Sequence, residues 1–150
     1  MNAYKTILVA LDFSRHSEAA LNEALRLAEL VEATVHVLHV FTLQDEVGVQ
    51  PTSRNFHNYM HDAEQAQLKA AGSRCRAAGK LGAVIWNTGD PATQILLTAK
   101  AVGAQILVLG ASGRAPLSRQ RLGSVVEAVL RRAPCTVMVV RYPNELHEHN

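Results

Sequence analysis

Five short apolar runs, separated by segments with helical periodicity, constrain the fold of this chain most strongly. The runs show little alternation of polar and apolar residues, which is typical of parallel strands covered on both faces. Parallel strands need crossover connections, and these are nearly always right-handed, so helices should coat both sides. The sequence therefore predicts an α/β fold, an open doubly wound sheet of five parallel strands. The strand order that we expect for such a sheet is 3-2-1-4-5. The predicted strands are residues 6–11, 34–40, 83–86, 105–109 and 136–140.

Helical patterns fill the spaces between the runs. Ser14 is a suitable cap for the first helix, and Asp90 followed by Pro91 is a typical start for the third. Gly103 is a typical residue to end that third helix. The predicted helices are residues 20–31 with the Ser14 cap, 56–79 with Gly72 as a partial break, 91–102, and 123–132, whereas residues 41–55 are predicted as a loop.

Length and composition favour one soluble domain over residues 1–150, with a core of about 4–142 and a polar tail at 143–150. The formal net charge of +2 is too small to predict binding to nucleic acid or to an anionic membrane. Cys75 and Cys135 form no CxxC pair, which indicates free thiols in a reducing compartment. No signal peptide is apparent, and we expect a cytoplasmic protein.

Glycines and polar residues gather where the predicted strands end. Asp12 follows the first strand, and Gly110 ends the fourth. Because open α/β sheets bind ligands at the carboxyl edge where strand order reverses, we expect Asp12 and Gly110 to face each other across a crevice. The helix that starts near Gly123 would point its amino end there, and the free N–H groups and dipole of such an end favour an anion.

The glycine spacing after the fourth strand is G-x2-G-x9-G-S, from Gly110 to Ser124. No GxxxxGK[ST] or GxGxxG pattern is present, which excludes a P-loop and a dinucleotide fingerprint. Together with VALDFS at residues 9–14 and GDP at 89–91, this spacing resembles the ATP-binding branch of the universal stress protein family. The resemblance covers essentially the whole chain. Two positions depart from the family pattern, Ala10 where Pro is frequent and Ser112 where His is frequent.

The resemblance implies a role for each matching residue. It places Asp12 near the ribose or the phosphates, and it implies a homodimer in which the last strands of two copies meet. Arg114, Arg119 or Arg121 could add positive charge, of which Arg114 is the preferred candidate, and Asp12 together with the phosphates could hold Mg²⁺. The implied contacts are Ala10, Leu11 and Val40 around the adenine, Gly110 and Gly113 along the ribose and phosphates, and Gly123, Ser124 and Val125 at the phosphates, with Leu109 completing the set.

The expected function is therefore an ATP-binding regulatory switch with an unknown protein partner, in which nucleotide acts on residues 111–122. The sequence contains no evident general base or nucleophile, so we do not expect an enzyme, although slow hydrolysis of ATP is left open. The alternative is a nucleotide-free interaction module of the same family. A receiver-like signalling domain is rejected, because Asp12 has no acidic neighbour and Arg141 follows the last strand. A metal site at His57 and His61 lacks an obvious third ligand.

Overall fold

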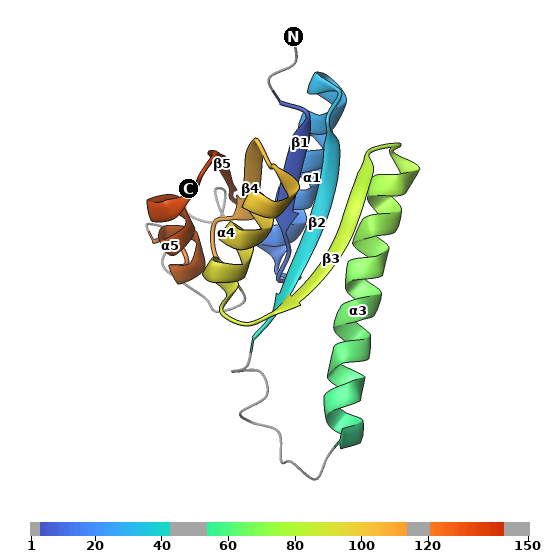
Figure 1. Ribbon diagram of the computed structural model, residues 1–150. Helices are drawn as coiled ribbons and strands as arrows, with labels where there is room; N and C mark the ends of the chain where they lie inside the picture. Colours follow the sequence, from blue (N-terminus) through green and yellow to red (C-terminus); the bar gives the residue numbers. More distant parts are fainter. Residues whose placement is uncertain (1–3, 43–53, 114–120, 143–150) are drawn as a thin grey trace, which may run out of the picture.

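In the computed structural model, residues 4–42, 54–113 and 121–142 are described, with side chains from residue 62 onward in the second range. Their strands form one parallel sheet in the order β3-β2-β1-β4-β5, as the sequence predicted (Figure 1). The neighbours β1 and β4 flank the point where strand order reverses. The strands are β1 Thr6–Ala10, β2 Thr34–Phe41, β3 Leu81–Thr88, β4 Ile106–Gly110 and β5 Thr136–Val140.

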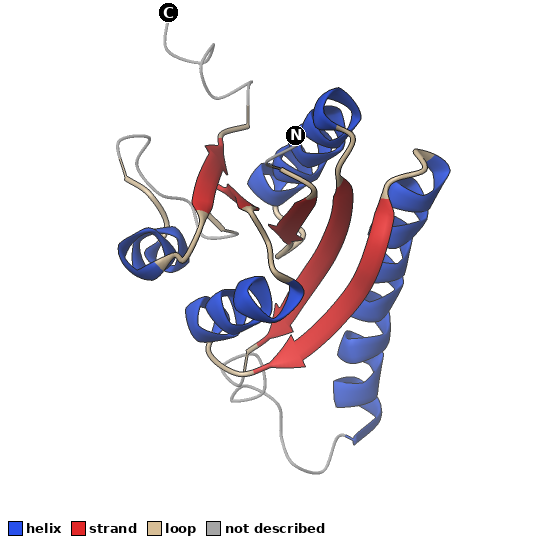
Figure 2. Cartoon of the chain, turned by 45° about the horizontal axis from the view of Figure 1, so that its top comes forward, coloured by secondary structure: helices blue, strands red, loops and turns tan. Residues whose placement is uncertain are grey.

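Helices cover both faces of this sheet, so the doubly wound fold is confirmed. One apolar cluster joins α1 and α3 to one face, and a second joins α4 and α5 to the other. Figure 2 shows α4 and α5 on the opposite side from α3. Successive residues of β1 belong to different clusters, with Ile7 in the first and Leu8 in the second. The helices are α1 Arg15–Val31, α3 Arg54–Ala77, α4 Pro91–Val102 and α5 Ser124–Arg132.

The helix caps lie where the sequence placed them. The Ser14 side chain accepts a hydrogen bond from the Ser17 N–H at the start of α1. The Asp90 carboxylate accepts from the Thr93 N–H at 3.0 Å, and this bond is the main cause that lowers the pKa of Asp90. Gly103 ends α4 in the left-handed conformation, with a φ of 67°.

The boundaries around β2 and β3 differ from the prediction. Phe41 was expected in a loop, but it ends β2, and its carbonyl accepts from the Gly89 N–H. The third strand is longer than the predicted 83–86 because it follows β2 along nearly its whole length. The register shifts opposite His36, whose ring Nδ1 accepts from the Ala83 N–H at 2.9 Å. The His36 side chain thus accepts the hydrogen bond that the extra residue of this β-bulge donates.

Gly72 does not break α3, contrary to expectation. A Cβ at this position would lie 2.7 Å from Val84 Cγ2, so the glycine permits close packing of α3 on β3. Both cysteines are free, as predicted. None of the helices in the described residues has the length and hydropathy needed to cross a membrane.

Candidate functional site

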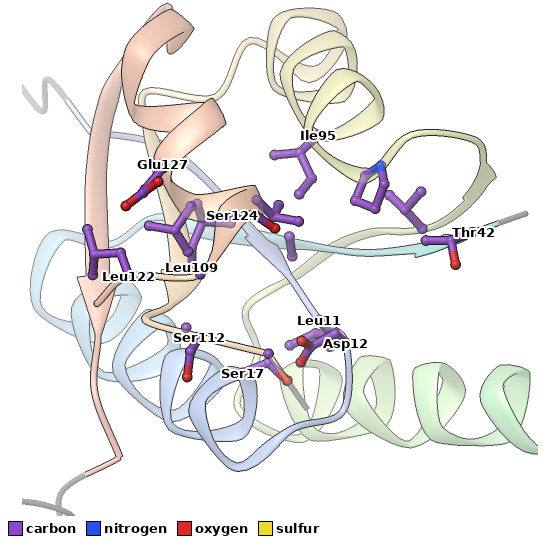
Figure 3. Close-up of a pocket in the computed structure, with 18 of the residues that line it drawn as sticks. Leu11, Asp12, Ser17, Thr42, Ile95, Leu109, Ser112, Leu122, Ser124 and Glu127 are labelled. Carbon is purple, nitrogen blue, oxygen red and sulfur yellow. The ribbon is translucent and has the colours of Figure 1, made fainter. Parts of the chain in front are cut away.

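A cavity of about 710 Å³ lies at the carboxyl edge of the sheet, beside the switch point between β1 and β4. In Figure 3, Leu11 and Asp12 lie next to each other, whereas Ser124 and Glu127 come from α5. Arg114 and Arg119 lie outside the described residues, and Arg121 lines the cavity. The structure brings together in this cavity all the other predicted residues, namely Ala10, Leu11, Asp12, Val40, Leu109, Gly110, Gly113, Gly123, Ser124 and Val125.

The amino end of α5 opens into the cavity. The N-cap residue of α5 is Gly123, which has no side chain to cap this end, and the helical hydrogen bonds begin with the Glu127 N–H, which donates to the Gly123 carbonyl. The N–H groups of Ser124, Val125 and Val126 therefore have no acceptor inside the helix. All three residues line the cavity, so the end of the helix presents donors and a positive dipole to it.

Gly123 plays a different part from the one that its position in the motif suggested. Its own N–H donates to the Ala111 carbonyl at 2.9 Å, so this amide is already engaged. A Cβ at Gly123 would lie 3.2 Å from Ser112 Cα. The glycine lets the chain after β4 pack closely against the start of α5, which fixes the wall of the cavity.

The absence of a side chain at Gly110 leaves room for the start of α1. A Cβ there would lie 2.6 Å from the His16 carbonyl carbon and 2.7 Å from the Ser17 nitrogen. At Gly113, a Cβ would lie 2.9 Å from Asp12 Oδ2. Gly110 thus lets α1 approach the end of β4, whereas Gly113 leaves space for the Asp12 carboxylate.

Asp12 lies in a tight turn between β1 and α1. Its Oδ1 accepts from the Ser14 N–H at 2.9 Å, while Ser14 itself caps the helix. The next residue, Phe13, has a φ of 64°, which is rare for a bulky side chain and costs about 1–3 kcal/mol. The turn that carries Asp12 is therefore strained, and its surroundings must hold it in place.

Two buried polar residues in the cavity wall, His39 and Glu64, were not among the predicted site residues. His39 Nε2 lies 2.8 Å from Glu64 Oε2, and His39 Nδ1 lies 2.6 Å from the Leu11 carbonyl oxygen. His36 and His39 are three residues apart in β2, so their side chains point to opposite faces of the sheet. Nothing in the sequence signals the partner of His39, because Glu64 lies on a separate helix.

The described residues contain no group of three or more His, Cys, Asp or Glu that could hold a metal ion on its own. The side chains of His57 and His61 lie outside the described part of α3. Burial raises the pKa of the Cys75 and Cys135 thiols, which disfavours the thiolate form that a nucleophilic cysteine needs. The cavity thus has amide donors, hydroxyls, the Arg121 side chain and an apolar wall, together with the carboxylates of Asp12, Glu64 and Glu127. The amide donors at the end of α5 suit the binding of an anion.

Comparison with known proteins agrees with this architecture. Residues 3–141 match the model of the universal stress protein family. The chain is 29% identical over 147 residues to the universal stress protein YxiE of Bacillus subtilis, which covers 92% of this chain and 99% of that protein. UspA of Lactobacillus plantarum is 28% identical, with a TM-score of 0.73 over 92% of this chain and 98% of that one. A universal stress protein in complex with cAMP is 26% identical, with a TM-score of 0.68 over 93% of this chain and 98% of that one. The chain therefore belongs to the universal stress protein family.

Proposed function

We propose that this protein binds an adenine nucleotide, ATP, in the cavity at the carboxyl edge of the sheet and acts as a nucleotide-dependent switch in the stress response. The observation that carries the proposal is the end of α5, where the N–H groups of Ser124, Val125 and Val126 line the cavity without acceptors inside the helix. Such a helix end favours phosphate, through its donors and its dipole.

The rest of the cavity supports a nucleotide rather than a free phosphate. Its volume of about 710 Å³ falls within the range of small-molecule and cofactor sites. Leu11 and Val40 are buried apolar residues that line it together with Ala10, and they would frame the adenine. The complex of a related protein with cAMP supports an adenine nucleotide as the class of ligand.

Asp12 is the proposed contact for the ribose or the phosphates, and for Mg²⁺ bound with them. Mg²⁺ is commonly held by one or two carboxylates together with phosphate oxygens, so a single aspartate suits a metal that arrives with the nucleotide. We therefore expect Asp12→Ala to weaken ATP binding more in the presence of Mg²⁺ than in its absence. Equal losses in both conditions would remove the metal from the proposal.

The proposed role is regulatory, with at most slow hydrolysis. Nucleotide binding would change the surface offered to a protein partner or to a second copy of the chain, because a ligand shifts an equilibrium toward the state that it prefers. The expected setting is the cytoplasm, and the expected assembly is a homodimer through β5.

Two measurements test the proposal. Gentle purification, denaturation and mass analysis of the released small molecules should yield an adenine nucleotide. ATP with Mg²⁺ should also raise the melting temperature, by the equivalent of about 2.7 kcal/mol at a hundred times the dissociation constant. A protein that releases no nucleotide and whose melting temperature does not respond to ATP would favour the alternative, an interaction module without nucleotide.

A further inference from the structure

A buried histidine and a buried glutamate join α3 to the chain that follows β1. His39 and Glu64 are each 5% exposed and line the cavity. The Leu11 carbonyl can only accept, so the His39 Nδ1 that lies 2.6 Å away carries a proton and donates it. The other ring nitrogen and the Glu64 carboxylate share a second proton across 2.8 Å. Both nitrogens of His39 are therefore engaged, one by α3 and one by the Leu11 peptide.

The Leu11 peptide begins the strained turn that carries Asp12. Phe13 has a φ of 64°, and strained backbone of this kind persists only where the surrounding structure holds it. His39 contacts the turn twice, through the bond to the Leu11 carbonyl and through its ring, whose centroid lies 4.5 Å from that of Phe13. The geometry around His39 therefore constrains the residues on both sides of Asp12.

Glu64 holds His39 in this orientation. The imidazole also lies beside Trp86, with 5.2 Å between the ring centroids, so its surroundings are aromatic as well as buried. Removing one partner of a buried hydrogen-bonded pair leaves the other group without compensation. Without the Glu64 side chain, Nε2 would lose this partner, and the bond to Leu11 and the ring contacts alone would hold the imidazole in place.

We propose that His39 and Glu64 form a positioning pair, which holds the Leu11–Phe13 turn and so sets the direction of the Asp12 carboxylate into the cavity. This inference rests on the proposed function for its effect on ligand affinity, but not for its effect on the turn. According to this inference, two residues outside the glycine motif help to position the side chains of the site.

The test compares three substitutions at Glu64. Glu64→Ala and Glu64→Leu remove the acceptor, and Leu also fills most of the space, whereas Glu64→Gln keeps a side chain that can bond to His39. In the ligand-free protein, Ala and Leu should shift the amide resonances of Asp12, Phe13 and Ser14 and abolish the protected imidazole N–H signal of His39. Their affinity for ATP with Mg²⁺ should fall by about tenfold, the loss expected when one hydrogen bond of ordinary strength is lost. Gln should restore the turn resonances and most of the affinity.

A neighbouring residue provides the control. Gln65 follows Glu64 on α3, is exposed, and lines a different cavity between α3 and β3. Gln65→Ala should leave both the turn resonances and the affinity for ATP unchanged. If Glu64→Ala does not fold, Glu64→Leu decides.

The outcomes separate this inference from the proposed function. Folded Ala or Leu variants whose turn resonances do not move would overturn the inference, as would displaced resonances with unchanged affinity. If the wild-type protein binds no ATP, the proposed function fails, and the amide resonances alone then decide whether the pair positions the turn.

Discussion

At the scale of single residues, two glycines of one motif perform different tasks. A Cβ at Gly110 would meet backbone atoms of His16 and Ser17 at 2.6–2.7 Å, and backbone cannot move away without shifting α1. A Cβ at Gly113 would meet only the end of the Asp12 side chain at 2.9 Å, and a carboxylate can rotate. The spacing of the motif alone does not distinguish these two requirements.

Alanine should therefore affect stability at one of these positions and ligand affinity at the other. Gly110→Ala should lower the free energy of unfolding by about 1–3 kcal/mol, because the core must be overpacked. Gly113→Ala should change it by less than about 0.5 kcal/mol, but it should weaken ATP binding by turning the Asp12 carboxylate. Chemical denaturation and calorimetric titration measure the two effects. Equal stability of the two variants would show that these close contacts do not limit the fold.

At the scale of secondary-structure elements, the amino end of α5 carries the proposed phosphate site. Gly123 has a φ of −63° and a ψ of 155°, which is the conformation favoured before proline. Proline is tolerated at the first position of a helix, as Pro91 shows in α4 of this chain. A proline at Ser124 would therefore remove one amide donor with little effect on the helix.

Ser124→Pro should fold normally and bind ATP about tenfold to a hundredfold more weakly than Ser124→Ala, since a hydrogen bond to a charged group contributes about 1.5–3 kcal/mol. The alanine variant loses the hydroxyl alone, so the difference between the two isolates the amide. Titration of both folded variants with ATP and Mg²⁺ measures it. Identical affinities would mean that the Ser124 amide does not contact the phosphates.

The bulge between β2 and β3 makes stability depend on pH. Burial lowers the pKa of His36 below its ordinary value of 6.5, and its Nδ1 must be unprotonated to accept from the Ala83 N–H. The unfolded chain therefore takes up this proton at a higher pH than the folded one. The contribution of His36 is fully present above about pH 6.5 and is lost as the pH falls through the folded pKa.

His36→Gln keeps an acceptor that does not titrate. Between pH 6.5 and 5, the free energy of unfolding should fall less steeply for this variant than for the wild-type protein. Urea denaturation at several pH values gives both slopes. Parallel slopes would show that His36 does not titrate on unfolding in this range.

The elements were predictable from the sequence because a parallel sheet covered on both faces leaves a strong pattern. The caps at Ser14 and Asp90 were predictable for another reason, because their chemistry is local. The bulge at His36 and the partnership of His39 with Glu64 were not, because each depends on a residue far along the chain. The motif identified the lining of the cavity, but only the structure shows that the Gly123 amide is already engaged by Ala111.

At the scale of the whole molecule, β5 forms one edge of the sheet. The Val140 carbonyl accepts from the Ala111 N–H at 2.8 Å, so the backbone groups of Val140 point toward β4. Successive residues of a parallel strand point these groups to opposite sides, so those of Val139 point outward. The outer edge of β5 is thus the surface where a second copy would pair in the proposed homodimer.

Val139→Pro should leave the monomer folded, because proline is tolerated where the N–H of an edge strand points away from the sheet. The dissociation constant of the dimer should be about tenfold higher than for the wild-type chain, since an N–H donor at the interface is lost. Sedimentation velocity gives the dissociation constants, and circular dichroism confirms folding. A folded variant with unchanged association would place the dimer interface elsewhere.

Titration of the ¹⁵N-labelled protein with ATP and Mg²⁺, followed by amide resonances, tests the central claim most directly. We expect the largest shifts at Ser124, Val125 and Val126, with a second group around Asp12, because phosphates would bond to these amides and magnesium would approach this carboxylate. Amide resonances that do not move at millimolar ATP, or shifts confined to the separate cavity between α3 and β3, would contradict the claim that this helix end binds the nucleotide.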